Sequence, residues 1–122
     1  MNHKDAITCL LDLKNGDIAS GSLDTTIKIW DPITGKCKRT LKGHTHAIIV
    51  LLELEDSHLV SSALDQTLVI WDVQTGVIFN TLEGFEQPIT QMVKLPNDVV
   101  AMNCNEFFFL CWEGVSDKKE NL

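Results

Sequence analysis

The sequence predicts an all-β protein made of about three repeats, each folding as a four-stranded antiparallel unit. Trp30, Trp71 and Trp112 are evenly spaced, 41 residues apart. Laying the chain on this period without a gap aligns SGSLDTTIKIWDPITGK (20–36) with SSALDQTLVIWDVQTGV (61–77). Short β-branched and aromatic stretches recur between turn residues, and no convincing helical pattern is found. Such periodicity is typical of stacked repeats.

Each predicted unit contains four short strands separated by turns. In the middle copy these strands are expected at residues 47–54, 58–64, 67–72 and 77–82. Asn15-Gly16 predicts a hairpin turn, and the DPITG and DVQTG loops place Gly35 and Gly76 where a positive φ is favourable. A four-stranded sheet of this length cannot bury both of its faces alone, so neighbouring units are expected to stack face to face.

Composition and charge narrow the class of protein. The chain has 122 residues, of which 44% are apolar, and carries 17 acidic against 10 basic side chains, for a net charge of -7. The length and apolar content are those of a globular domain. A surface of this sign repels a phosphate backbone, so nucleic acid is not expected as a partner. No apolar run is long enough to cross a bilayer, so no membrane association is expected.

The cysteines and the short motifs give no indication of site chemistry. Cys9, Cys37, Cys104 and Cys111 form no CxxC pair and no usual zinc spacing, which favours reduced thiols in a cytoplasmic or, alternatively, nuclear protein. Cys104 and Cys111 are expected on opposite faces of a hairpin, which disfavours a disulfide. The sequence contains no GxSxG, HExxH or GxxxxGK[ST] motif. No catalytic, cofactor-binding or metal site is therefore predicted.

Two dipeptides identify the repeat. Gly43-His44 precedes the first strand of the second copy, and Trp30-Asp31 and Trp71-Asp72 end the third strands. In phase on one period, these motifs resemble WD40 repeats, the blades of β-propellers. The resemblance covers nearly all of the chain except the tail VSDKKENL. It implies blades at residues 2–42, 43–83 and 84–114, followed by a polar tail at 115–122.

In WD40 repeats a His, a Ser or Thr, an Asp and the Trp share a buried hydrogen-bond network. The resemblance assigns these roles to His3, Ser20, Asp24 and Trp30 in the first blade, to His44, Ser61, Asp65 and Trp71 in the second, and to Trp112 in the third. The four groups supply complementary donors and acceptors, and one left unpaired costs about 1–3 kcal/mol. Asp, His and Ser also suggest a catalytic triad, but recurrence in consecutive units favours a structural role.

The third copy has lost most of this network. In NEFFFLCWEG, Glu106 stands at the turn Asp, Phe107 to Phe109 replace the Thr-rich strand start, and Glu113 replaces the Asp of Trp-Asp. Phe85 and Met102 stand at the His and Ser positions. Apolar residues that replace several polar partners together leave none of them unpaired. We therefore expect a hydrophobically rebuilt strand here rather than a docking patch.

The resemblance implies a platform that binds proteins or peptides through loops at the narrow end of the propeller channel. By position these loops hold Asp5, Ala6, Leu23, His46, Ala47, Leu64, Gln87, Pro88 and Asn105. Leu23 and Leu64 are the clearest candidates, because apolar side chains at a loop tip either face a partner or pack beneath the loop. His46, two residues after His44, is expected to make a surface contact rather than to bind a metal.

The basic run Lys36-Cys37-Lys38-Arg39 and the nearby Lys42 lie at the predicted fourth strand of the first blade. Lysines there usually protect an exposed β edge. A nuclear signal or a phosphate-binding patch is the alternative.

The strand count predicts an open propeller. It gives four, four and three strands, so the last blade is expected to lack its outer strand, and three blades cannot close a ring of about four to eight. The chain is then a piece of a larger propeller, one of two copies that share a ring, or completed by a different polypeptide. A non-enzymatic scaffold is the function expected. The alternatives are the substrate-recruiting portion of an enzyme or ubiquitin-ligase complex, and a truncated product without a partner.

Overall fold

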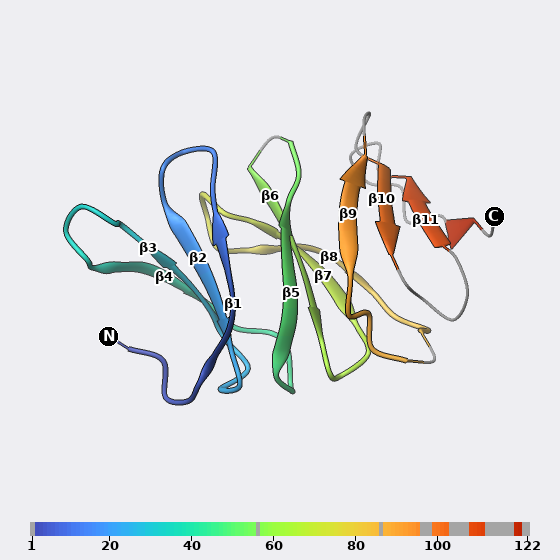
Figure 1. Cartoon of the computed structure of the whole chain (residues 1–122), viewed down its shortest axis with the longest axis horizontal. Helices are drawn as coiled ribbons and strands as arrows, with labels where there is room; N and C mark the ends of the chain where they lie inside the picture. Colours follow the sequence, from blue (N-terminus) through green and yellow to red (C-terminus); the bar gives the residue numbers. More distant parts are fainter. Residues whose placement is uncertain are drawn as a thin grey trace.

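The chain folds into three four-stranded antiparallel sheets (Figure 1). The computed structural model describes residues 2–55, 57–85, 87–95, 99–102, 108–111 and 119–120. Every regular element within these ranges is a β-strand. The predicted all-β fold of about three antiparallel units is thus confirmed, as is the prediction that the sheets form no closed ring.

Each sheet is a meander in which consecutive strands pair. The first sheet contains β1 (Ile7–Asp12), β2 (Ile18–Ser22), β3 (Ile27–Trp30) and β4 (Cys37–Leu41). The second contains β5 (Ile48–Glu53), β6 (His58–Ala63), β7 (Leu68–Asp72) and β8 (Ile78–Leu82). The third contains β9 (Met92–Leu95), β10 (Val99–Met102), β11 (Phe108–Cys111) and β12 (Lys119–Glu120). The strands predicted in the middle copy agree with β5 to β8 within two residues at each end.

The outer edge of the third sheet corrects one prediction. The sequence predicts no outer strand there, yet β12 pairs with β11 through Phe109↔Glu120 and Leu110↔Lys119. The segment predicted as a polar tail therefore supplies a two-residue edge strand. An edge strand needs backbone hydrogen bonds on one side only, and short charged segments are common at sheet edges. The polar composition of the predicted tail therefore gave no indication that it would pair with β11.

The turns combine predicted and unpredicted backbone conformations. Gly35 and Gly76 have φ values of 75° and 78°, as the DPITG and DVQTG loops predict. Thr25 and Gln66 also have positive φ, at 76° and 68°. Each follows an Asp whose side chain accepts a hydrogen bond from the backbone two residues further on. This local Asx-type bonding stabilises a turn at a position that does not require glycine.

Two hydrophobic cores fill the spaces between the three sheets. Alternate residues of β7 point to opposite cores: Val69 and Trp71 belong to the core with the first sheet, and Leu68 and Ile70 to the core with the third. This follows from the two-residue period of a strand. The second sheet is therefore buried on both faces, as stacking of the units predicts. The first strands of the sheets lie next to one another, with β5 between β1 and β9 (Figure 1).

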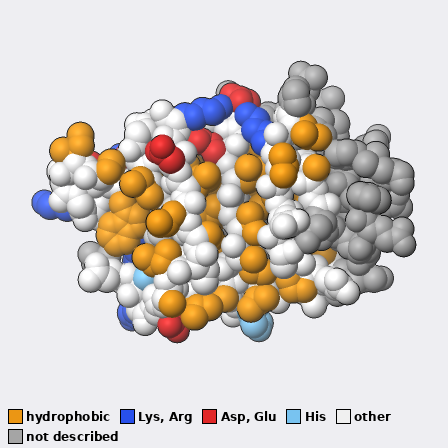
Figure 2. All heavy atoms as spheres, viewed as in Figure 1, with side chains coloured by type: hydrophobic (Ala, Val, Ile, Leu, Met, Phe, Trp, Pro, Cys, Tyr) orange, Lys and Arg blue, Asp and Glu red, His pale blue; other side chains and the backbone are white. Residues whose placement is uncertain are grey.

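One face of the first sheet remains open to solvent among the described residues. Ile7 and Leu10 are 53% and 68% exposed, whereas Ile48 and Leu51, one repeat later, are 1% and 7% exposed because the first sheet covers them. Figure 2 shows hydrophobic side chains gathered on the side of the molecule formed by the first sheet. The same repeat positions are thus buried in the second sheet and exposed in the first.

Candidate functional site

His44, Ser61, Asp65 and Trp71 form one hydrogen-bonded chain in the second sheet. Trp71 Nε1 donates to Ser61 Oγ at 2.8 Å, Ser61 Oγ lies 2.7 Å from His44 Nε2, and His44 Nδ1 lies 3.0 Å from Asp65 Oδ2. Burial lowers the pKa of His44 despite the hydrogen bond with Asp65, so the imidazole is neutral at pH 7. Because the carboxylate only accepts, Nδ1 carries the ring proton and Nε2 accepts from Ser61.

The first sheet repeats this chain with His3, Ser20, Asp24 and Trp30. Trp30 Nε1 donates to Ser20 Oγ at 2.8 Å, and Ser20 Oγ lies 2.6 Å from His3 Nε2. His3 Nδ1 lies 2.9 Å from Asp24 Oδ2. The structure thus brings together both sets of four residues. Trp112, the remaining candidate from the third blade, lies outside the described residues.

Two threonines extend the networks beyond what the sequence analysis identified. Thr26 Oγ1 donates to Asp24 Oδ1 at 2.6 Å, and Thr67 Oγ1 donates to Asp65 Oδ1 at 2.7 Å. The backbone N–H after each histidine donates to the other oxygen at 2.9 Å. Although burial opposes ionisation, these hydrogen bonds lower the pKa of both carboxyls. Their shared position two residues after each Asp could have identified both threonines.

The connectivity of Ser, His and Asp is that of a catalytic triad, but its serine and histidine side chains are buried. Ser20 and Ser61 are 1% and 0% exposed, and the side chain of His44 is fully buried. Each serine hydroxyl also accepts an indole N–H. A nucleophile must contact its substrate, and these hydroxyls lie inside the sheets. The geometry favours stabilisation of each unit over catalysis.

The neutral, buried His44 predicts a loss of stability in mild acid. Its folded pKa lies below its ordinary value of 6.5, so its contribution to the free energy of unfolding is complete above about pH 6.5. That contribution is lost as the pH falls through the folded pKa. The lowered pKa values of Asp24 and Asp65 add a second loss below about pH 4.

We expect the urea midpoint of unfolding to fall between pH 7 and pH 5, measured by circular dichroism. His44→Phe should flatten this pH dependence because the titrating group is gone. His46→Gln removes an exposed histidine two residues away and should leave the dependence unchanged. Equal slopes in the wild-type chain and His44→Phe would contradict the assignment.

The predicted loop-face residues of the first two sheets come together in pairs. The backbone N–H of Leu23 donates to Ala6 O, and that of Leu64 donates to Ala47 O, both at 2.9 Å. Leu23 and Leu64 are 45% and 51% exposed. Their side chains therefore reach the surface instead of packing beneath the loop. These pairs stand just before β1 and β5 and just after β2 and β6, and this end of the strands is the lower one in Figure 1.

The remaining loop-face candidates among the described residues are mostly polar and exposed. Asp5, His46 and Gln87 are exposed, and Pro88 is half-buried. Thr45 Oγ1 lies 3.0 Å from His46 Nδ1, which orients the exposed imidazole. Asn105 lies outside the described residues.

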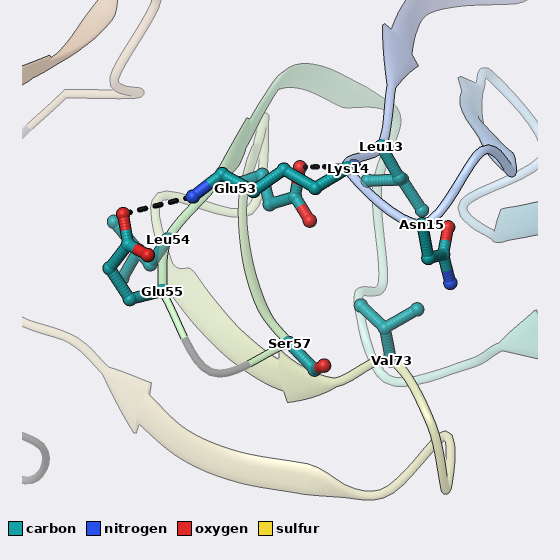
Figure 3. A pocket seen from close by; sticks show the side chains of 8 residues that line it. All are labelled: Leu13, Lys14, Asn15, Glu53, Leu54, Glu55, Ser57 and Val73. Carbon is teal, nitrogen blue, oxygen red and sulfur yellow. Dashed lines mark hydrogen bonds and ion pairs between the residues drawn. The ribbon is translucent and has the colours of Figure 1, made fainter.

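A hollow of about 300 Å³ lies at the opposite end, between the first two sheets (Figure 3). It is lined by Leu13, Lys14, Asn15, Glu53, Leu54, Glu55, Ser57 and Val73. Lys14 Nζ donates to Glu55 at 2.9 Å, and Lys94 of the third sheet pairs with the same carboxylate. The hydrogen bonds from Lys94 and Lys14 lower the pKa of Glu55 to about 2. One carboxylate therefore links all three sheets, although salt screens such exposed pairs.

The described residues were also compared with the requirements of a metal site, a membrane-spanning helix and a disulfide. No group of three or more His, Cys, Asp or Glu residues there could hold a metal ion. Among those same residues, no helix has the length and hydropathy needed to cross a membrane. Cys9 and Cys37 are free thiols, and burial raises the pKa of Cys9. The side chains of Cys104 and Cys111 are not among those described.

Stacked four-stranded sheets, each of the first two carrying the same His, Asp, Ser and Trp network, define a repeat protein built from propeller blades. The chain belongs to the family described as WD domain, G-beta repeat, whose profile matches residues 1–31 and 35–72. The resemblance in the sequence motifs is thereby confirmed. Proteins of this family mediate protein–protein interactions.

Three relatives show where such repeats occur. The chain is 53% identical over 47 residues to mitogen-activated protein kinase kinase kinase A of Dictyostelium discoideum, and 46% identical over 43 residues to F-box/WD repeat-containing protein 7 of Drosophila melanogaster. It is 53% identical over 45 residues to nuclear distribution protein nudF 2 of Aspergillus clavatus. The matches cover 36%, 35% and 36% of this chain, but only 5%, 3% and 10% of the relatives.

A solved structure matches almost the whole chain. The crystal structure of the computationally designed Ika4 protein is 32% identical, with a TM-score of 0.81. The match covers 98% of this chain and 73% of that one. The arrangement of stacked four-stranded units is therefore that of an experimentally determined protein.

Proposed function

We propose that the chain is a non-enzymatic scaffold that binds a protein or peptide through its loop face, as part of a larger or oligomeric propeller. The observation that carries this proposal is the exposure of Leu23 and Leu64 at the same position of consecutive blades. Each is hydrogen-bonded to the segment before the first strand of its own sheet, so the two apolar tips are held in defined positions. Exposed apolar groups in fixed positions favour protein partners.

The surroundings of these leucines support the same proposal. Asp5, His46 and Gln87 are exposed in the segments before the first strands, where they would form the polar rim of an apolar centre made by the leucines. Protein interfaces commonly have this arrangement, because the centre excludes water while the rim remains solvated. A partner peptide would place an apolar side chain between the blades and polar groups at the edge.

The open face of the first sheet supports completion by a further blade. Ile7 and Leu10 occupy the positions at which Ile48 and Leu51 are buried by a preceding sheet. Covering them would remove apolar surface from water, worth about 25 cal/mol for each Å². Size-exclusion chromatography with light scattering tests the source of that blade. A stable monomer would exclude a ring shared by two copies, and a dimer would support it.

A second candidate is the substrate-recruiting portion of an enzyme or ubiquitin-ligase complex. The similarity to a protein kinase and to an F-box protein favours it. Sequencing of full-length transcripts separates the two candidates. A kinase or F-box segment in the same reading frame would support recruitment, and its absence from every transcript would support the scaffold alone.

Leu64→Asp should abolish binding of a loop-face ligand without unfolding the chain, because the side chain is half exposed. Peptides selected from a displayed library against the wild-type chain supply the ligand, and calorimetry measures affinity. We expect a loss of at least about tenfold, since an apolar contact is replaced by a charge. The matched control is Ile33→Asp. It also replaces an apolar side chain by Asp, at a 92% exposed isoleucine between β3 and β4 of the first sheet, away from the loop face. Equal losses in both variants would contradict the assignment of the loop face.

A further inference from the structure

A buried lysine lies on the open face of the first sheet. Ile27 and Ile29 of β3 belong to the core shared with the second sheet, so Lys28 between them points to the opposite, open face. Lys28 is nevertheless only 5% exposed, and its Nζ donates to Thr40 Oγ1 at 2.8 Å. The surface that the proposed function assigns to a further blade therefore contains an ammonium group that is already largely withdrawn from water.

This ammonium group has no carboxylate partner among the described residues. Lys14, Lys38 and Lys94 each pair with an Asp or Glu, whereas no such pair forms at Lys28. Within the described ranges its Nζ donates to the Thr40 hydroxyl alone, although an ammonium group has three donors. A covering blade would remove the remaining water, and burying a cation without a counter-charge is unfavourable.

The nearby carboxylate of Asp24 is already engaged in the network of the first blade. Asp24 and Lys28 line the same hollow of about 410 Å³. The oxygens of Asp24 accept hydrogen bonds from the imidazole of His3, the Thr26 hydroxyl and backbone N–H groups. The counter-charge for a covered Lys28 therefore has to come from the covering blade.

The second blade shows what this position holds when a sheet covers it. Val69 stands one repeat after Lys28 and is 2% exposed. It belongs to one core with three residues of β3 and β4, namely Ile27, Ile29 and Leu41. An apolar sheet face therefore suits a valine at this position. The same apolar face laid over Lys28 would bury its charge without a partner.

The charges disfavour a second copy of this chain as the covering blade. In a head-to-tail ring, the third sheet of one copy would cover the first sheet of the next. Its described residues at the repeat positions that face the next sheet are apolar: Val93, Leu95 and Ala101. Face-to-face pairing of two first sheets would instead bring Lys28 and the exposed Lys4 of each copy against like charges. A partner of different sequence is therefore favoured.

We propose that the first sheet is covered by a blade of different sequence that presents an Asp or Glu side chain to Lys28. The candidate positions in that blade correspond to Ile27, Ile29 and Leu41, which cover the same place in the second sheet. A carboxylate there would accept charge-assisted hydrogen bonds from the remaining ammonium donors. Such a pair makes the face selective, because a wholly apolar blade leaves the cation unpaired. The proposal rests on the proposed function, since it names the chemistry of the further blade.

A tandem chain tests this proposal. It carries a second copy of residues 2–42 directly before residue 2 of the full chain, which keeps the repeats in register and places an added blade next to the first sheet. The three candidate positions of the added blade are randomised, and yeast-displayed chains are selected for resistance to protease. We expect enrichment of Asp or Glu at one of these positions. When the full chain carries Lys28→Val, the residue found one repeat later, we expect apolar residues there instead.

Lys36→Val is the matched control, because it makes the same substitution at an exposed lysine of the same blade. It should leave the enrichment of acidic residues unchanged, and loss of that enrichment here would overturn the proposal by showing general charge attraction. Purified tandem chains give a second measurement. Replacing the selected Asp or Glu by its amide should lower the urea midpoint of unfolding with Lys28, but not with Lys28→Val.

The outcomes separate this proposal from the completion on which it rests. Suppose that apolar residues are enriched equally with Lys28 and with Lys28→Val, in chains more resistant than the chain without an added blade. That result would overturn the acidic partner while supporting completion by a further blade. If no added blade raises the protease resistance with either residue, completion by a further blade is contradicted, and the proposal with it.

Discussion

Trp71→Ala should lower the free energy of unfolding by about 3–5 kcal/mol. Trp71 is 1% exposed in the core between the first and second sheets, and its Nε1 donates to Ser61 at 2.8 Å. The truncation therefore creates a large cavity at an interface between blades. It also removes the hydrogen bond that Ser61 Oγ accepts from the indole N–H. Both losses lower the free energy of unfolding.

Trp30→Ala is the matched control for this prediction. Trp30 donates to Ser20 at the same distance, but it is only half-buried, and no described sheet covers it. Its truncation removes the hydrogen bond while leaving a smaller cavity, so the loss should be at least about 1 kcal/mol smaller. Urea unfolding followed by circular dichroism measures both variants. Equal losses in a monomeric sample would contradict the idea that the first sheet covers Trp71.

The period of the sequence predicted the fold of the first two units because their turn chemistry repeats. Gly35 and Gly76 have nearly the same φ, and β5 to β8 fall where the middle copy predicts them. The third unit was less predictable. Its outer strand β12 comes from a charged segment that does not repeat the apolar residues of β8, and strands pair through backbone groups that every sequence provides. Backbone pairing at an edge leaves little trace in the sequence.

In the candidate site, too, some contacts could be predicted from the sequence and others could not. The residues joined in the two networks could be assigned from the resemblance, because each network lies within one repeat. Contacts between repeats could not be assigned, because they depend on how the sheets pack. Glu55 links Lys14 and Lys94, which do not occupy equivalent repeat positions. Comparison of the copies position by position could still have identified Lys28, where the next repeat has Val69.

The third unit shows that the polar network can be replaced as a set. Phe85 and Met102 stand at the positions of His44 and Ser61, and they are 5% and 6% exposed in the core between the second and third sheets. The chain thus accepts buried apolar residues at positions that hold hydrogen-bonded polar residues in the second blade. This observation predicts that the members of the second network are energetically coupled.

His44→Phe and Ser61→Ala should each be strongly destabilising, yet less than additive together. Ser61→Ala leaves His44 Nε2 and Trp71 Nε1 unpaired inside the sheet, at about 1–3 kcal/mol for each group. His44→Phe removes one of those two groups, so the double variant has one fewer unsatisfied polar atom than the single changes imply. We expect a coupling free energy of about 0.5–3 kcal/mol from a double-mutant cycle measured by urea unfolding.

Ser20→Ala with Ser61→Ala provides the additive reference for this cycle. The two serines make the same bonds in different sheets and share no partner, so their losses should add within about 0.5 kcal/mol. A coupled His44–Ser61 pair beside an uncoupled Ser20–Ser61 pair would show that each blade holds its own cooperative unit. Additivity in both cycles would instead mean that each polar group finds another partner once its neighbour is removed. The joint replacement by Phe85 and Met102 would then need a different explanation, namely the packing volume of the third unit.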